Sequence, residues 1–358
     1  MSSLPTIKDV ALLAGVSIGT VDRVVHNRGK VSERNMKAVQ NAIDALGYRP
    51  SRIASALVKR RNGLKIGVCI PNVESEFWAE AMEGVHRAEE KLSPFGVTLV
   101  VDTNRTYDFR DQKASILRLL SEGVNALLLV PVQGKESQLD ELIPPEIPYA
   151  TVIEDIPDSR RLFHVGPNDC AMGTLAGRLA LLYSGPGLQC VILAANCQFW
   201  GTQDRIRSFQ EFLAKHDPTA KVLSTCEIPI QSERIAYQSI YEIAEQQMEL
   251  HPEMNTFYVT NGLTQWAAAA VKNHKKQGQI RVFGYEHTEM TDTFLRDGII
   301  SATICQGPAR QWYNAIYIMN EVLAGERTIE NPVFNAECRI LIEETIPFMR
   351  AESFSDTF

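Results

Sequence analysis

The first fifty residues show three short amphipathic patterns. Apolar side chains recur at the spacing of one helical face in residues 7–14, 18–25 and 33–46, and Gly15 and Gly47 end the first and third patterns. A hydroxyl residue that can cap a helix precedes each pattern: Thr6, Ser17 and Ser32. The pattern predicts three helices around a small core, and the first two, joined by a Gly-containing turn, have the plan of a helix-turn-helix.

From residue 64 the pattern changes to short apolar runs that alternate with amphipathic helices. Such runs are typical of parallel strands buried on both faces. We expect strands at 65–71, 97–101, 126–131, 148–153 and 162–166, and a second series at 190–193, 221–224, 256–259 and 280–284. We expect helices at 77–92, 110–122, 170–182, 204–215, 233–249 and 265–276. The rhythm predicts two α/β lobes in series, each with a doubly wound parallel sheet.

Charge separates the helical head from the rest of the chain. The formal net charge is −7, but residues 1–61 hold eleven Lys and Arg against four Asp and Glu, a charge of +7, and the remainder carries −14. A basic head on an acidic body indicates that the head has an anionic partner. Solvated charge on an ordinary domain gives the same pattern, so this alternative stays open.

Length and motifs exclude several classes of protein. The 358 residues suffice for roughly two to three domains, and no apolar run approaches the ~18 residues of a membrane span. The N-terminus lacks the basic start and apolar core of a signal peptide, and the seven cysteines form no CxxC pair. We therefore expect a soluble cytoplasmic protein with reduced thiols and no membrane contact.

Signatures of catalysis and cofactor binding are absent from the sequence. The seven histidines show no metal-ligand spacing, and there is no GxSxG, no Walker loop and no GxGxxG after the first strand. We expect no enzymatic activity, no catalytic residue, no metal site and no cofactor. Two alternatives remain: a sugar-acting enzyme built from carboxylates that pair only in space, and a secreted binding protein.

The second helix is the element that would enter the major groove of DNA. Arg23 is suited to a phosphate or a guanine, and Ile18 to a thymine methyl group. The outward positions are Ser17, Ile18, Gly19, Asp22, Arg23 and His26. Residues 50–61 follow as a short basic segment that should become helical only when something holds it. A packing unit without a ligand and a solvated linker are the alternatives for these two segments.

These residues closely resemble the headpiece of the lactose-repressor/galactose-repressor family of transcription factors. The resemblance covers about sixty residues and is carried by Thr6-Ile7-Lys8-Asp9-Val10-Ala11, Ala14-Gly15-Val16-Ser17, Thr20-Val21, Arg23-Val24, Val31-Ser32 and Leu46-Gly47-Tyr48-Arg49-Pro50. It implies that residues 18 and 19 read bases, that the linker folds into a hinge helix on DNA, and that Leu57 inserts into the minor groove. The implied DNA contacts are Thr6, Ser17, Ile18, Gly19, Thr20, Asp22, Arg23, His26, Asn27, Ser32, Tyr48, Arg52, Ala54 and Leu57. Asp22, Gly19 and Ser51 depart from the common residues of the family, and they bear on the operator sequence.

The body resembles ribose-type periplasmic binding proteins and the matching repressor cores over roughly residues 64–345. In that fold a ligand binds between the lobes, and the chain crosses between them near 165–168, 298–303 and 330–336. The implied domains are a helix-turn-helix headpiece (1–49), a hinge (50–62), a first lobe (63–166 with 301–332) and a second lobe (167–300 with 333–358).

Candidate ligand residues lie in loops after the strands, where open α/β sheets bind their ligands. Phe77 and Trp78 resemble an aromatic pair that stacks on a sugar ring, although such a pair also serves as a hydrophobic cap on the following helix. Arg205 resembles an arginine that donates a fork of hydrogen bonds to ligand hydroxyls. The implied ligand contacts are Ser75, Phe77, Trp78, Asn104, Glu154, Asp155, Trp200, Arg205, Asn261, Glu286 and Gln306.

The pair Glu154-Asp155 stands where ribose-type binders carry an Asp-Arg pair. A carboxylate in place of the cation, together with Glu286, makes the predicted pocket acidic. We therefore expect a polyhydroxylated ligand that is neutral or carries an amine, such as a sugar, polyol or amino sugar, and not a sugar phosphate. The resemblance as a whole implies a homodimeric repressor that binds an approximately palindromic operator and is controlled by this small-molecule effector.

Overall fold

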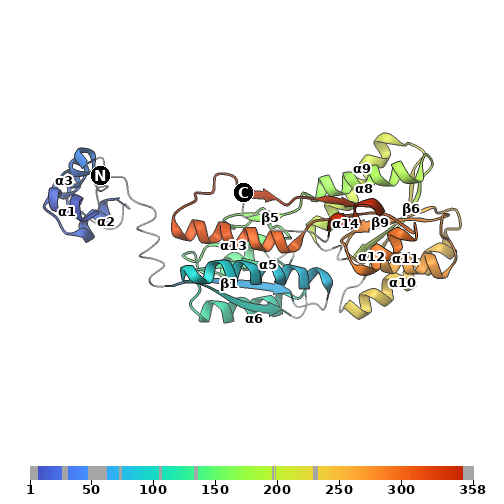
Figure 1. Ribbon diagram of the computed structural model, residues 1–358, viewed down its shortest axis with the longest axis horizontal. Coiled ribbons are helices and arrows are strands. Elements are labelled where there is room, and N and C mark those ends of the chain that lie inside the picture. The colour runs from blue at the N-terminus through green and yellow to red at the C-terminus, as the bar shows by residue number, and fades with distance from the viewer. Residues whose placement is uncertain are drawn as a thin grey trace. The chain divides into compact units, whose positions relative to one another are not determined.

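The computed structural model describes residues 7–25, 31–46, 63–71, 75–104, 107–132, 136–195, 197, 199–228 and 233–349. The chain divides into two compact units, Met1–Gly63 with Glu321–Thr328 and Leu64–Asn320 with Ile329–Phe358. Figure 1 shows the elements of both units along the chain.

The first unit contains three helices, α1 (Ile7–Ala14), α2 (Ile18–Val25) and α3 (Glu33–Leu46). Their apolar faces meet in a small core of Val10, Ala11, Val21, Val39 and Ala42. Gly15 takes a left-handed conformation, with φ of +64°, in the turn between α1 and α2. The predicted bounds of all three helices are confirmed.

The second unit holds two six-stranded sheets, which define two lobes. The sheet of the first lobe has the order β11-β5-β4-β3-β1-β2, and all of its strands are parallel. Its strands are β1 (Leu64–Pro71), β2 (Val97–Asn104), β3 (Ala126–Leu129), β4 (Tyr149–Val152), β5 (His164–Gly166) and β11 (Val333–Asn335). Its helices are α5 (Glu76–Leu92), α6 (Phe109–Ser121), α7 (Glu136–Leu142) and α13 (Pro308–Ala324).

The sheet of the second lobe has the order β12-β10-β9-β8-β6-β7, in which only β12 is antiparallel to its neighbour. Its strands are β6 (Gln189–Ala195), β7 (Lys221–Ile228), β8 (Thr256–Val259), β9 (Arg281–Tyr285), β10 (Ile300–Cys305) and β12 (Arg339–Leu341). Its helices are α8 (Asp169–Ser184), α9 (Trp200–His216), α10 (Glu233–Leu250), α11 (Thr264–Asn273) and α12 (Glu289–Arg296), followed by the short α14 (Ile346–Met349).

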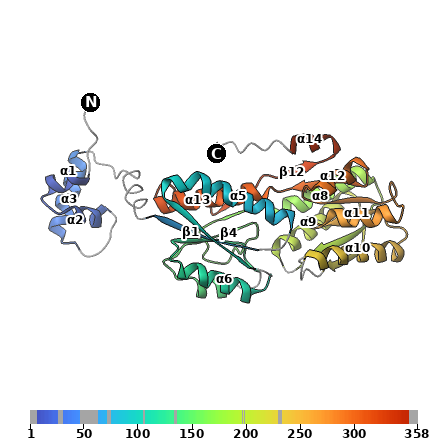
Figure 2. The same ribbon diagram turned by 60° about the horizontal axis from the view of Figure 1, so that its bottom comes forward.

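Helices cover both faces of each sheet, so the predicted doubly wound fold class is confirmed. In the first lobe α5 and α13 lie on one face and α6 on the other (Figure 2). In the second lobe α8 and α9 share one buried cluster with the sheet, and α10, α11 and α12 share another. The inner strands β1, β3 and β6 are apolar runs because both of their faces are buried, whereas the edge strands β2 and β7 are partly exposed.

Two of the expected domain boundaries are wrong. The strand β10 pairs with β9 and β12 in the second lobe, although residues from 301 onward were expected in the first. The strand β11 pairs with β5 in the first lobe, although residues from 333 onward were expected in the second. The chain therefore crosses after Cys305 and again between Asn335 and Arg339. A short apolar strand carries no local signal for the sheet it joins, because pairing is decided by distant segments.

Part of the C-terminal third was not predicted from the pattern of apolar positions. The elements α12, α13, α14, β10, β11 and β12, together with α7 earlier in the chain, have no counterpart among the expected helices and strands. Across the described ranges, none of the helices is both long and apolar enough to span a membrane.

Candidate ligand and DNA sites

The exposed face of α2 carries the predicted base-reading residues that the structure describes. Ser17, Ile18, Gly19 and Arg23 are exposed, whereas Val21 on the opposite side is fully buried. The hydroxyl of Ser17 accepts a hydrogen bond from the backbone N–H of Thr20 (3.2 Å), which caps the helix. Arg23 Nε donates to the carbonyl oxygen of Gly19 (3.0 Å), so its guanidinium lies over the start of the helix.

Further DNA predictions concern the start of α3 and the segments around the helices. Ser32 is exposed, and its hydroxyl accepts a hydrogen bond from the N–H of Asn35 (3.4 Å). The predictions for Thr6, His26, Asn27, Tyr48, Arg52, Ala54, Leu57 and the side chain of Asp22 lie outside the described residues, as does the hinge.

The second unit contains a cavity of about 1170 Å³, part of which is open solvent. It is lined from both lobes by loops and helix ends that follow the carboxyl ends of strands. Eight of the predicted ligand residues line it: Ser75, Phe77, Trp78, Glu154, Arg205, Asn261, Glu286 and Gln306. The structure thus gathers residues that lie more than 200 positions apart in the sequence.

Three predicted ligand residues do not line the cavity. Asn104 ends β2 at the edge of its sheet, is 1% exposed, and its Oδ1 lies 3.8 Å from the Sγ of Cys69. Trp200, the first residue of α9, is 51% exposed, and its neighbour Phe199 lines the cavity instead. Asp155 is engaged in a separate network. The structure thus places these three side chains away from the cavity that the other eight share.

Several polar or aromatic lining residues were not predicted. They are Glu76, Glu80, Tyr107, Thr202, Tyr237, Gln265, His287 and Thr288. His287 and Thr288 directly follow Glu286 beyond the end of β9, so the rule that ligands bind after strand ends contains the signal for them. Gln265 and Tyr237 come from α11 and α10, and no local motif marks them.

Aromatic side chains form one wall of the cavity. The rings of Phe77 and Trp78 are 5.0 Å apart and nearly perpendicular, at 85°, so they present one edge and one face and not two parallel walls. Trp78 Nε1 donates to the hydroxyl oxygen of Tyr107 (2.9 Å), and the ring of Tyr107 lies 5.6 Å from that of Phe199 in the second lobe. This cluster provides apolar surface for the C–H face of a ring-shaped ligand.

Arg205 is the one Lys or Arg among the described lining residues. Its Nε donates to Asp169 Oδ1 (2.6 Å), its Nη1 donates to the carbonyl oxygen of Thr260 (3.0 Å), and its guanidinium carbon lies 4.4 Å from the centre of the Tyr285 ring. Burial opposes the charge of Arg205, but Asp169 raises its pKa, and the net direction is upward. Arg205 therefore stays positively charged, and within the described part of the chain its Nη2 has no hydrogen-bond partner.

Two glutamates of the cavity are unusual in their environment. Glu286 has a φ of +70°, a strained conformation for a residue with a Cβ, and Gln306 Nε2 donates to its Oε1 (2.5 Å). Burial raises the pKa of Glu286 to about 7. Burial, and secondarily the charge of Asp169, raises the pKa of Glu154 to about 8. The cavity therefore holds carboxyl groups that burial destabilises in their charged form.

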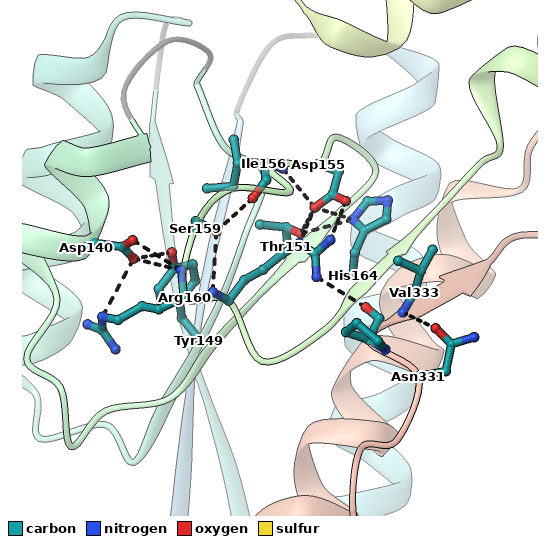
Figure 3. A network of polar contacts seen from close by, with 12 residues as sticks. Asp140, Tyr149, Thr151, Asp155, Ile156, Ser159, Arg160, His164, Asn331 and Val333 are labelled. Atoms are coloured by element: carbon teal, nitrogen blue, oxygen red, sulfur yellow. Dashed lines mark hydrogen bonds and ion pairs between the residues drawn. The ribbon is translucent and has the colours of Figure 1, made fainter.

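Asp155 belongs to a network in the first lobe (Figure 3). Its carboxylate accepts hydrogen bonds from Arg161 Nε and Nη2, from the hydroxyl of Thr151 (3.0 Å) and from the N–H of Ile156 (2.8 Å). Arg161 Nη1 also donates to the carbonyl oxygen of Pro332 (3.3 Å), directly before β11. The network thus ties the loop that carries Glu154 to the part of the lobe where the chain crosses.

We expect Arg161→Ala to lower the free energy of unfolding by about 2 kcal/mol. The change leaves Asp155 without its counter-charge, but the effect should stay below the ~3–5 kcal/mol of a fully buried pair because Asp155 is 22% exposed. Chemical denaturation of the variant against Arg110→Ala, an exposed arginine of α6, measures the difference. Equal stability of the two variants would show that the network contributes nothing.

Comparison with known families identifies the two units. Residues 66–327 match the periplasmic binding protein domain, and residues 6–51 match bacterial regulatory proteins of the lacI family. The chain belongs to the periplasmic binding protein domain family and carries a lacI-family headpiece. The resemblance predicted from the sequence is confirmed for both the headpiece and the core.

Relatives of this protein are named as regulators. It is 26% identical to the HTH-type transcriptional repressor PurR of Vibrio parahaemolyticus over 354 residues, which are 96% of this chain and 99% of the relative. It is 26% identical to the HTH-type transcriptional regulator DegA of Bacillus subtilis over 58% of this chain and 60% of that relative. It is 33% identical to the ribose operon repressor of Halalkalibacterium halodurans over 35% of this chain and 37% of that relative.

Solved structures confirm the fold of the core. The glucose-galactose binding protein GanP from Geobacillus stearothermophilus has a TM-score of 0.70 and 23% identity, and the match covers 80% of this chain and 99% of GanP. A putative LacI transcriptional regulator from Bacteroides fragilis has a TM-score of 0.69 and 20% identity, with 80% of this chain and 99% of that chain covered. Both likenesses confirm the two-lobed periplasmic-binding-protein fold.

Proposed function

We propose that this protein regulates transcription by binding an approximately palindromic operator as a homodimer, under the control of a sugar-like effector in the cavity. The observation that carries the proposal is the combination, in one chain, of a lacI-type headpiece with an exposed α2 face and a core whose cavity gathers Arg205, Asn261 and an aromatic wall. The relatives named as transcriptional repressors support a role in regulating transcription. The ribose operon repressor and GanP support a carbohydrate effector.

Ligand and operator are then linked thermodynamically. A ligand that binds one state of the core more tightly than the other shifts the population of DNA-binding molecules, and operator DNA shifts ligand affinity by the same factor. The sign of the effect depends only on which state the ligand prefers. The regulators among the relatives favour this role over an enzyme that acts on sugars.

We expect the double variant Ile18→Ala/Arg23→Ala to lose the sequence preference of the headpiece. Both side chains are exposed on α2, so their removal should reduce specific binding by about tenfold to a hundredfold per lost base contact. Binding to random DNA should weaken only as much as the loss of one positive charge requires. Selection of random duplexes by the full chain first identifies the operator, and titrations of both duplex types then compare the variants.

Lys37→Ala is the matched control for this experiment. Lys37 is exposed on α3, and its removal takes away one positive charge from the same headpiece without changing α2. It should weaken binding to all DNA sequences nearly uniformly. If the double variant also weakens operator and random DNA equally, α2 does not read bases.

A further inference from the structure

Two glutamates of the cavity, the buried Glu286 and the partly exposed Glu154, share the influence of one cation, Arg205, whose charge favours the ionised form of both. Arg205, the lining cation, forms its ion pair with Asp169, which does not line the cavity. Within the residues that the structure describes, neither Glu154 nor Glu286 takes part in an ion pair. Glu76 and Glu80 from α5 add two more carboxyl groups to the lining. Among the described lining residues, carboxyl groups therefore outnumber cations, and burial opposes the ionisation of Glu154 and Glu286.

Two buried hydrogen-bond acceptors of the cavity lining also have no donor among the described residues. Gln306 is 6% exposed, and its Nε2 donates to Glu286, which fixes the orientation of the amide and leaves Oε1 as an acceptor. Over the described residues this Oε1 has no partner, and the Oε1 of Gln265, which is also 6% exposed, has none. Buried acceptors without a donor are costly, so the lining of the cavity favours an occupant that brings donors.

A neutral sugar satisfies only part of this requirement. Its hydroxyl groups donate hydrogen bonds, but they bring no positive charge that would stabilise the ionised form of Glu154 or Glu286. A phosphate would place further negative charge beside carboxyl groups whose ionisation burial already opposes. An ammonium group supplies up to three donors and one positive charge, and it also gains from the nearby aromatic wall of Phe77 and Trp78.

We propose that the effector carries a protonated amine that binds between Glu154 and Glu286, so that the cavity selects an amino sugar or amino polyol over its neutral counterpart. This inference rests on the sugar-like effector of the proposed function and names its chemical class. Arg205 Nη2 and the amide of Asn261 are then available for the hydroxyl and ring oxygens of the same ligand.

The test compares matched carbohydrates on the full chain at neutral pH by calorimetry. The probes are D-glucosamine, D-glucose and N-acetyl-D-glucosamine, and the corresponding series from galactose and mannose. In at least one series the amine should bind at least tenfold more tightly than its neutral and acetylated counterparts, as expected for hydrogen bonds to charged groups. Neutral members that bind as tightly as the amines would overturn the inference and leave the sugar-like effector standing.

Two nearly isosteric variants test the carboxyl groups directly. Glu286→Gln and Glu154→Gln should each reduce the preference for the amine about tenfold or more and largely retain the binding of neutral sugars. Glu249→Gln, which changes an exposed glutamate at the end of α10, is the control and should keep the preference. Amine preference that survives both cavity variants would overturn the inference. Failure of every carbohydrate to bind would overturn the effector class of the proposed function, and the inference with it.

Discussion

Arg205→Ala should abolish carbohydrate binding and lower the free energy of unfolding by about 3–5 kcal/mol. The Arg205 side chain is 8% exposed, and that of its partner Asp169 is 14% exposed, so the change leaves a largely buried carboxylate without its counter-charge. It also leaves the carbonyl oxygen of Thr260 without the guanidinium donor and removes the contact with the Tyr285 ring. Stability and binding should therefore fall together.

Arg207→Ala is the matched control for this prediction. Arg207 lies two positions later on α9, its side chain is 59% exposed, and its ion pairs with Asp204 and Glu211 are on the surface. Such pairs are screened by solvent and contribute little, so the control should unfold almost like the unmodified protein and bind carbohydrate equally well. Arg205→Lys keeps the positive charge but loses the fork of hydrogen-bond donors. Its free energy of unfolding should therefore fall less than that of Arg205→Ala, whereas its affinity for carbohydrate should still be strongly reduced. Urea denaturation and calorimetry of the three variants separate these effects, and unchanged affinity in Arg205→Ala would remove Arg205 from the site.

Much of the fold can be predicted from the sequence, because strands that are buried on both faces appear in it as continuous apolar runs. In β1 the residues Ile66, Val68 and Ile70 are all fully buried, together with Cys69 between them, and the run is continuously apolar. In helix α5 the buried residues instead recur at the spacing of one helical face, from Trp78 to Leu92. These two periods distinguish strand from helix without knowledge of any distant contact.

Which of two neighbouring side chains enters the cavity cannot be determined from the sequence. Glu154 lines the cavity and Asp155 does not, because Ile153 takes a φ of +71° and Arg161, six residues further on, holds Asp155. In the same way Phe199 lines the cavity and Trp200 is exposed. The sequence identifies both pairs as candidates, but backbone conformation and partners distant along the chain decide between their members.

The position of a strand within its sheet is the second property that local sequence does not contain. Asn104 ends a strand, as a ligand residue should, but β2 lies at the edge of its sheet. The crossings at β10 and β11 were misplaced for the same reason, since strand order follows from pairing with segments far away in the chain. The acidic character of the cavity was nevertheless predicted, although it comes from Glu154, Glu286, Glu76 and Glu80 and not from Asp155.

Gly173→Ala should lower the free energy of unfolding by about 3 kcal/mol, and it should weaken carbohydrate binding as well. A Cβ at Gly173 in α8 would lie 2.2 Å from the carbonyl oxygen of Arg205 and 2.8 Å from its carbonyl carbon in α9. Backbone atoms cannot rotate away, so the two helices must separate at the point where Asp169 holds Arg205. The gain of about 1 kcal/mol that alanine brings to a helix offsets only part of this cost.

Gly177→Ala provides the control one turn later on the same helix. There the added Cβ would lie 2.9 Å from Cδ1 of Phe212, and an aromatic side chain can shift by a few tenths of an ångström where a backbone carbonyl cannot. The helix propensity of alanine then offsets most of the crowding, and we expect a loss of about 1 kcal/mol or less. Urea denaturation of both variants measures the difference, and carbohydrate titration should show weaker binding only for Gly173→Ala. Equal losses at both positions would mean that the separation of α8 and α9 is set by side chains and not by the backbone contact that positions Arg205.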